Sequence, residues 1–223
     1  MGTRVRVHNV RHKGRDLRVL RLDPVPARLA LRDDDRWLSM YADREGSARL
    51  VDLWALAARS PRSLIHLPIR GNDVPPDVVT EGEPVALDLV LLHHSLQFPT
   101  GSWKEVRARL GAGNPQTVTA SPDEFPETVD HDRRRHKTYR DRLGFDVAAH
   151  TFFIVGSPTA FREDGAAVRG LIDEAPGYLH KWPNAGHFCV ELAHGQWDTP
   201  TRKHVPGDLH IQYCPDWLAA PAS

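Results

Sequence analysis

The sequence predicts an α/β (or α+β) protein with a central mixed, partly parallel sheet flanked by helices. Apolar β-prone runs alternate with helical stretches from residue 47 to about residue 193, which is typical of a partly parallel sheet covered by helices. β-prone runs at the two ends of the chain add an N-terminal β-meander and a C-terminal β-hairpin. The chain has 223 residues, 40% of them hydrophobic, and no long Gly/Ser or Pro tract. We therefore expect one domain over 1–223, with a β-rich segment 1–46, an α/β core 47–185 and a closing strand pair 186–216.

The N-terminal elements follow from short apolar runs and the turn residues between them. Runs at 3–10, 17–22 and 27–31 are separated by Lys13-Gly14 and by the prolines of 24–26, and 37–41 could add a fourth strand. Apolar residues at helical spacing predict a helix over 47–59, closed by Pro61. Strands are then expected at 63–69 and at 84–92, the most apolar run of the chain.

The second half of the chain begins with two helix signals. Ser102 and Glu105 form a capping box for a helix that ends at Gly111. A second start signal at 121–124 predicts a helix to residue 143, with a break allowed at Pro126. A short strand at 151–156 then leads into a helix that starts at Ser157, and strands at 187–193 and 209–214 close the fold.

Composition excludes several classes of partner. The chain carries 29 basic and 29 acidic residues, so its charge gives no general attraction to nucleic acid or to an anionic membrane. Its longest apolar stretch is far too short to span a bilayer, and residues 1–9 have no apolar signal region. We therefore expect a cytoplasmic protein without a membrane partner and without nucleic acid. Two cysteines do not make a disulfide framework.

Three polar clusters follow apolar strands, and they form the first candidate site. Ligands bind in open α/β sheets outside the carboxyl ends of parallel strands. If the strands at 63–69, 84–92 and 151–156 are parallel neighbours, these clusters meet at one edge as ligand-binding and catalytic groups: Arg70, Asn72 and Asp73; His93, His94 and Ser95; Ser157 and Thr159. His93 or His94 would be the catalytic acid or base, and Ser157 at a helix N-terminus would favour an anion. The alternative is that these residues only cap helices and form turns.

The closing hairpin is the second candidate site. Strict alternation places Phe188, Val190 and Leu192 on an apolar face, so the polar residues share the other. A register that sets Ala193 opposite Asp208 also sets Glu191 opposite His210. The shared polar face offers ligands for zinc or another divalent metal: His187, Cys189, Glu191, His210 and Cys214. Cys189 could instead be a catalytic thiol activated by a histidine. The spacing matches no standard zinc motif, and an ordinary cross-strand pair remains the alternative.

The third candidate is the arginine-rich stretch over 130–142. It could contact phosphate or nucleic acid, but neutral overall charge favours a solvated helix stabilised by pairs such as Asp132 with His136. Signature motifs for dinucleotides, P-loop nucleotides, α/β-hydrolases and kinases do not occur.

The sequence thus leaves three hypotheses for function. The first is an enzyme acting on a small polar or anionic metabolite at the strand ends. The second is a non-catalytic binding, immunity or regulatory protein, for which a protein partner or a homo-oligomer stays open. The third is a metal-dependent, zinc-like enzyme built on the hairpin.

Overall fold

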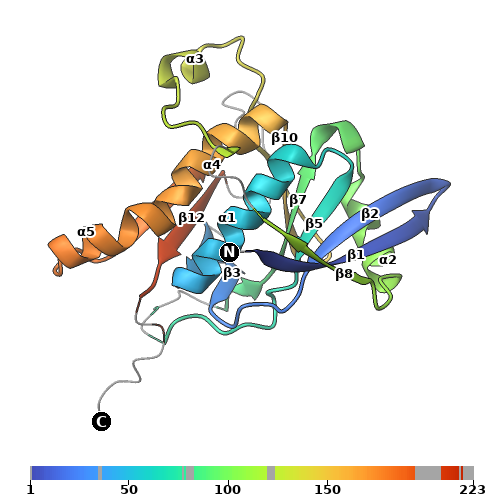
Figure 1. The fold of residues 1–223 in the computed structure, drawn as a ribbon, viewed down its shortest axis with the longest axis horizontal. Coiled ribbons are helices and arrows are strands. Elements are labelled where there is room, and N and C mark those ends of the chain that lie inside the picture. Colours follow the sequence, from blue (N-terminus) through green and yellow to red (C-terminus); the bar gives the residue numbers. More distant parts are fainter. Residues whose placement is uncertain are drawn as a thin grey trace.

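Two β-sheets lie beneath a pair of long helices in the computed structural model, which describes residues 2–34, 37–76, 78, 83–119, 124–193, 207–215 and 217 (Figure 1). The fold class expected from the sequence is confirmed, because the larger sheet is mixed and partly parallel and helices cover it. No helix among these residues is long and apolar enough to cross a membrane.

Sheet A is the larger sheet. Its seven strands lie in the order β8-β1-β2-β5-β7-β10-β9 and comprise β1 (Thr3–His12), β2 (Arg15–Leu22), β5 (Ser63–Leu67), β7 (Asp88–His93), β8 (Asn114–Val118), β9 (Gly144–Ala148) and β10 (Thr151–Gly156). The pairs β2–β5 and β7–β10 are parallel, whereas β5 and β7 are antiparallel. The predicted strand at 151–156 is confirmed with the same bounds.

Sheet B contains the closing strand pair. Its order is β11-β12-β4-β3-β6, with β3 (Leu29–Asp33), β4 (Leu38–Ala42), β6 (Val85–Ala86), β11 (Phe188–Ala193) and β12 (Asp208–Tyr213). The register predicted for the closing pair is confirmed, since Ala193 lies opposite Asp208 and Glu191 opposite His210. β12 also pairs in parallel with β4, so the hairpin extends a larger sheet.

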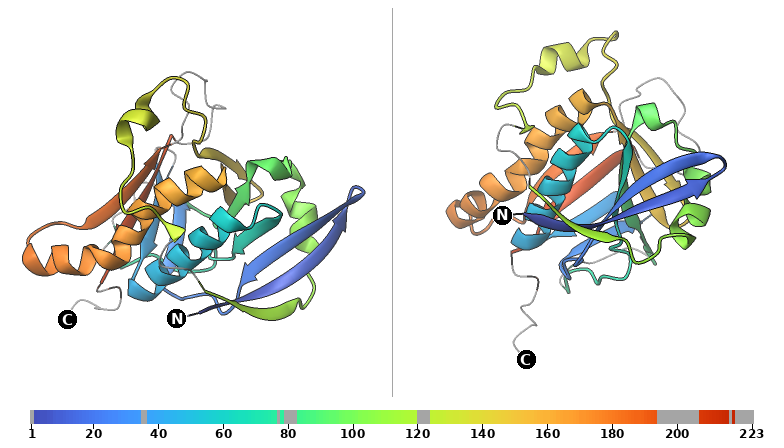
Figure 2. Two further views of the ribbon diagram at one scale, coloured as in Figure 1. Left: turned by 45° about the horizontal axis from the view of Figure 1, so that its top comes forward. Right: turned by 45° about the vertical axis from the view of Figure 1, so that its right-hand side comes forward.

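The two long helices are α1 (Arg44–Arg59) and α4 (Pro158–Asp173), which pack side by side (Figures 1 and 2). Asp43 caps α1 and Ser157 caps α4, each accepting a hydrogen bond from a backbone N–H of the first turn. The shorter helices are α2 (Trp103–Ala108), α3 (His131–Arg135) and α5 (Ala175–Lys181), with 3₁₀ turns η1 (His94–Leu96) and η2 (Thr100–Ser102).

The apolar core is continuous between the sheets. Side chains from both sheets pack with α1 and α4 into one cluster that includes Trp54, Met40 and Ile154. A second cluster covers the opposite face of sheet A, where Trp103 and Val106 of α2 pack on the strands. Sheet A is therefore covered on both faces, and its polar groups beneath α2 are buried.

Three expected elements differ from the observed ones. The N-terminal strands form two hairpins, β1–β2 in sheet A and β3–β4 in sheet B, so they do not make one continuous meander. The strand predicted over 84–92 divides at Leu87, with β6 in sheet B and β7 in sheet A.

The helix predicted over 121–143 is wrong. Its start signal at 121–123 lies outside the described residues, and α3 (His131–Arg135) is the only α-helix among the described residues of this stretch, which is followed by β9 from Gly144. The stretch between them carries too few apolar side chains for a buried helical stripe. The apolar pattern of the sequence also does not predict the two edge strands of sheet A, β8 and β9. In the case of β8, the strand is largely exposed and contains Pro115.

Candidate functional site

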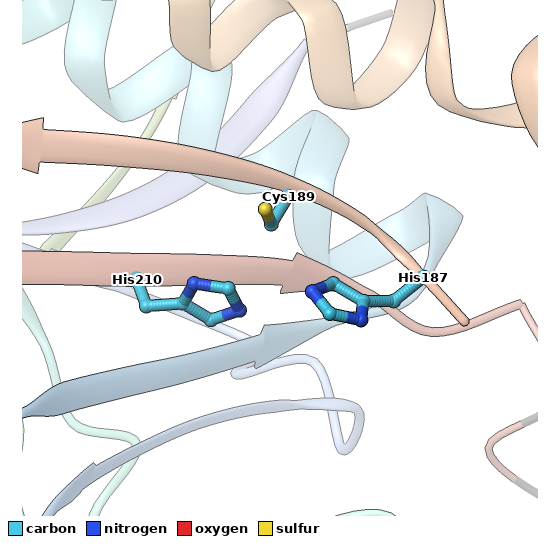
Figure 3. Close-up of side chains that lie close together, drawn as sticks. All are labelled: His187, Cys189 and His210. Atoms are coloured by element: carbon cyan, nitrogen blue, oxygen red, sulfur yellow. The ribbon is translucent and has the colours of Figure 1, made fainter. Parts of the chain in front are cut away.

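The hairpin brings three metal-ligating residues together on the outer face of sheet B. His187 immediately precedes β11, Cys189 belongs to β11 and His210 belongs to β12. One ligand atom from each of these residues lies within 4.8 Å of the other two. Figure 3 shows the two imidazole rings facing each other, with the thiol on the same side of the strands. The centroids of the two rings are 5.4 Å apart.

Strand alternation explains why these side chains share a face. Val190 and Leu192 of β11 point into the core and are almost fully buried. Their neighbours along the strand must therefore point outward, so Cys189 and Glu191 face away from the core. His210 lies directly opposite Glu191. The sequence pattern thus predicts the cluster correctly at the level of the shared face.

Glu191 orients one of the ligands. Its carboxylate forms a hydrogen bond with Nδ1 of His210. A carboxylate on one ring nitrogen fixes the orientation of the imidazole and leaves Nε2 for a metal, which is the usual outer-shell arrangement of a metal-bound histidine. Glu191 is therefore placed as a supporting group for His210.

The environment of Cys189 opposes its predicted role as a nucleophile. Burial and then the negative charge of Glu191 raise the pKa of the Cys189 thiol. The Cys189 sulfur lies 4.0 Å from a carboxylate oxygen of Glu191. A thiol in this setting stays protonated at neutral pH unless a cation neutralises the site. A bound metal ion would supply that charge.

Cys214, the remaining predicted ligand, lies apart from this cluster. Its backbone N–H donates to the carbonyl of Ala42 at 2.8 Å, so it continues the ladder with β4. Its side chain is buried with Tyr41 and Trp217. This packing, in an apolar cluster on the β4 side of the strand, separates it from the three ligands.

No protein-family model, curated protein or solved structure matches this chain.

The predicted convergence of three strand-end clusters is wrong for one of them. β7 and β10 are parallel with His93 opposite Gly156, so the clusters after these two strands do lie at one edge. β5 runs antiparallel to β7, which places Arg70, Asn72 and Asp73 at the opposite edge of the sheet.

His93 is buried, while His94 and Ser95 are exposed. Nδ1 of His93 is 2.6 Å from the hydroxyl of Ser95 and also accepts from the Ser95 backbone N–H at 3.2 Å. Burial, and to a lesser extent His94, lowers the pKa of His93, which keeps its imidazole neutral. His93, the last residue of β7, and His94, the first residue of η1, therefore face different environments.

Ser157 is engaged as a helix cap. Its Oγ accepts from the Ala160 backbone N–H at 3.0 Å and donates to the carboxylate of Asp141 at 2.6 Å. Thr159 is half-buried in the same turn. A carboxylate already occupies this helix start, so the structure offers no support for an external anion at Ser157.

Asn72 and the arginine-rich stretch also have structural roles. The Asn72 amide donates to the carbonyls of Pro26 and Leu29 at 2.8 and 2.7 Å, which fastens the segment after β5 to sheet B. Arg134 forms an ion pair with Asp164 at 2.5 Å, and the Tyr139 hydroxyl donates to Glu163. Tertiary contacts therefore connect the arginine-rich stretch to α4, and within α3 itself Arg135 lies 3.9 Å from Asp132 at the i,i+3 spacing.

The sequence reasoning missed a polar group beneath α2. His66 in β5 and Asp88 in β7 are buried, with His66 Nε2 3.7 Å from an Asp88 oxygen. The Arg107 guanidinium lies 3.2 Å from the same carboxylate. The available signal was an ionisable residue in each of two mainly apolar strands, His66 and Asp88, because such residues are rarely buried without a partner.

Proposed function

We propose that this protein binds a zinc ion through His187, Cys189 and His210 and uses it in a metal-dependent reaction. The observation that carries the proposal is the grouping of the three ligand atoms within 4.8 Å, together with the Glu191 carboxylate on Nδ1 of His210. Two imidazoles and a thiolate are ligands that zinc accepts in tetrahedral sites.

Among the described residues the cluster has three ligands, a number that favours a catalytic role over a structural one. Structural zinc sites have four protein ligands, whereas catalytic sites have three and keep the fourth position for water or substrate. His187 is exposed, so solvent reaches this face of the cluster. A zinc ion here would act as a Lewis acid and would lower the pKa of bound water.

Metal analysis of protein prepared without a histidine tag tests the proposal. We expect about one zinc ion per chain and at least a hundredfold weaker binding in Cys189→Ser and in His210→Ala, because each loses one of three ligands. Glu191→Gln keeps all three ligands and should weaken binding by about ten- to a hundredfold. His94→Ala is the matched control, since it removes an exposed histidine outside the cluster.

Cobalt substitution tests the open coordination position. The cobalt protein should show a thiolate charge-transfer band that disappears in Cys189→Ser, and azide should change its visible spectrum. Substoichiometric metal, or equal affinity in all four variants, would remove the metal proposal. A spectrum unchanged by azide would leave a closed structural site and contradict catalysis.

A further inference from the structure

A pocket of about 370 Å³ lies at the carboxyl ends of the parallel strands β2 and β5. Four of its lining residues come from different elements: Arg21 from β2, His66 from β5, Asp88 from β7 and Arg107 from α2. Arg70, in the segment after β5, adds a fifth polar side chain. Because Arg107 of α2 lines the pocket, the pocket lies on the face of sheet A that α2 covers, whereas α1 packs on the other face. Its volume is in the range of small-molecule sites.

The charges lining this pocket favour an anion. Three guanidinium groups surround one carboxylate. Asp88 is already satisfied, because it accepts from the Arg70 backbone N–H at 3.0 Å and from Arg107 at 3.2 Å. Although burial alone would raise the pKa of Asp88, its contacts with His66 and with that N–H hold the pKa below its ordinary value, so the group is ionised. Among the described residues, the guanidiniums of Arg21 and Arg70 make no hydrogen bond or ion pair.

His66 supplies an independent sign of a ligand. Its side chain is 2% exposed, yet neither ring nitrogen makes a hydrogen bond among the described residues, the Asp88 carboxylate being 3.7 Å from Nε2. The ring packs edge-on against Trp103 with centroids 5.0 Å apart, which fixes its orientation. A neutral imidazole has one donor and one acceptor, and leaving them unpaired in the interior costs free energy. A polar group bound in the pocket would pair with one of the two ring nitrogens.

We propose that this pocket binds a small molecule through a phosphate group. Arg21 and Arg70 would pair with the phosphate oxygens, and His66 would exchange a hydrogen bond with them. Two uncommitted guanidiniums and an imidazole match the several acceptor oxygens and the double charge of a phosphate better than they match a single carboxylate. The site shares no residue with the metal cluster on sheet B.

Calorimetric titration of the intact protein with inorganic phosphate tests the inference. We expect saturable binding of one phosphate per chain, weakened by about ten- to a hundredfold in Arg21→Gln and in Arg70→Gln, since each removes charged hydrogen bonds to the anion. Arg70 is exposed and its side chain holds no other described residue, so Arg70→Gln should fold normally. Arg135→Gln is the matched control, because it removes the same charge from an exposed position in α3.

Acetate serves as the competing anion in the same titrations. Binding of acetate as tight as that of phosphate would overturn the phosphate assignment. Absence of saturable phosphate binding, or equal weakening in Arg135→Gln and Arg70→Gln, would overturn the site itself. Zinc content should be the same in all of these variants, so failure here is distinct from failure of the metal proposal.

Discussion

Thr151 lies at the start of β10, where it contacts Arg107, a member of the buried polar group under α2. Its side chain is fully buried, and its hydroxyl oxygen accepts from Nε1 of Trp103 at 3.1 Å and from Arg107 at 3.2 Å. Thr151→Val keeps the size of the side chain but removes the acceptor. We expect a loss of about 2–3 kcal/mol in the free energy of unfolding, because the buried indole N–H loses its partner at about 1–3 kcal/mol and Arg107 loses one of two partners.

Urea unfolding followed by tryptophan fluorescence measures this loss. Thr151→Ser is the matched control, since it keeps the hydroxyl and removes one methyl group, at about 1 kcal/mol. Phosphate affinity should also fall in Thr151→Val and not in Thr151→Ser, because Arg107 lines the pocket. A valine variant as stable as the serine variant would refute the assignment of these hydrogen bonds as stabilising.

Two further predictions concern buried histidines and the helix cap. Burial lowers the pKa of His66. Between about pH 6.5 and that lowered pKa, His66 is therefore protonated in the unfolded chain and neutral in the folded protein. The free energy of unfolding then falls with decreasing pH by up to about 1.4 kcal/mol per pH unit. Burial is also the main cause of the lowered pKa values of His8 and His93, so these residues act in the same direction. Urea unfolding at pH 7.5 and 5.5 measures the effect: the difference in the free energy of unfolding between the two pH values should be smaller in His66→Leu than in the parent. An unchanged difference would contradict this. Ser157→Ala should cost about 1 kcal/mol through loss of the α4 cap, while phosphate affinity stays the same; a loss of affinity would instead restore the predicted anion site at that helix.

The closing hairpin was predictable because one of its faces is buried. A shift of one residue would turn Val190 and Leu192 outward, so the apolar pattern fixes which side chains share a face. The sequence therefore located His187, Cys189 and His210 on one surface. It could not exclude Cys214, because the position of that side chain depends on packing with Tyr41 and Ala30, which come from a distant part of the chain.

The direction of β5 relative to β7 was not recognised, although the sequence contains a relevant signal. A parallel pair needs a crossover connection, usually a helix, and no helix was predicted between the strands at 63–69 and 84–92. The chain instead passes through β6 in sheet B before it re-enters sheet A beside β5. β7 and β10 are separated by α2, β8, α3 and β9, and they are parallel. The secondary structure of the segment that connects two strands was thus a better guide to their relative direction than the polar residues at the strand ends.

The arginine-rich stretch shows a different limit. Arg134 pairs with Asp164 of α4, whereas the pair at helical spacing, Arg135 with Asp132, is highly exposed. The local sequence pattern can predict a helix cap such as Asp130, whose side chain accepts a hydrogen bond from the backbone N–H of Arg133. It cannot predict an ion pair between residues far apart in the sequence, such as Arg134 with Asp164.

The buried polar group under α2 follows from a requirement that could have been applied to the sequence. An ionisable residue inside an apolar strand needs a partner, since an unpaired buried charge is too costly to retain. Asp88 meets this requirement through Arg107 and the Arg70 N–H. His66 meets it only in part, because its Nε2 lies 3.7 Å from Asp88 but neither ring nitrogen makes a hydrogen bond among the described residues. The contact with Asp88 therefore leaves the hydrogen-bonding capacity of the His66 ring unused, and the phosphate that we propose for this pocket would supply a partner for it.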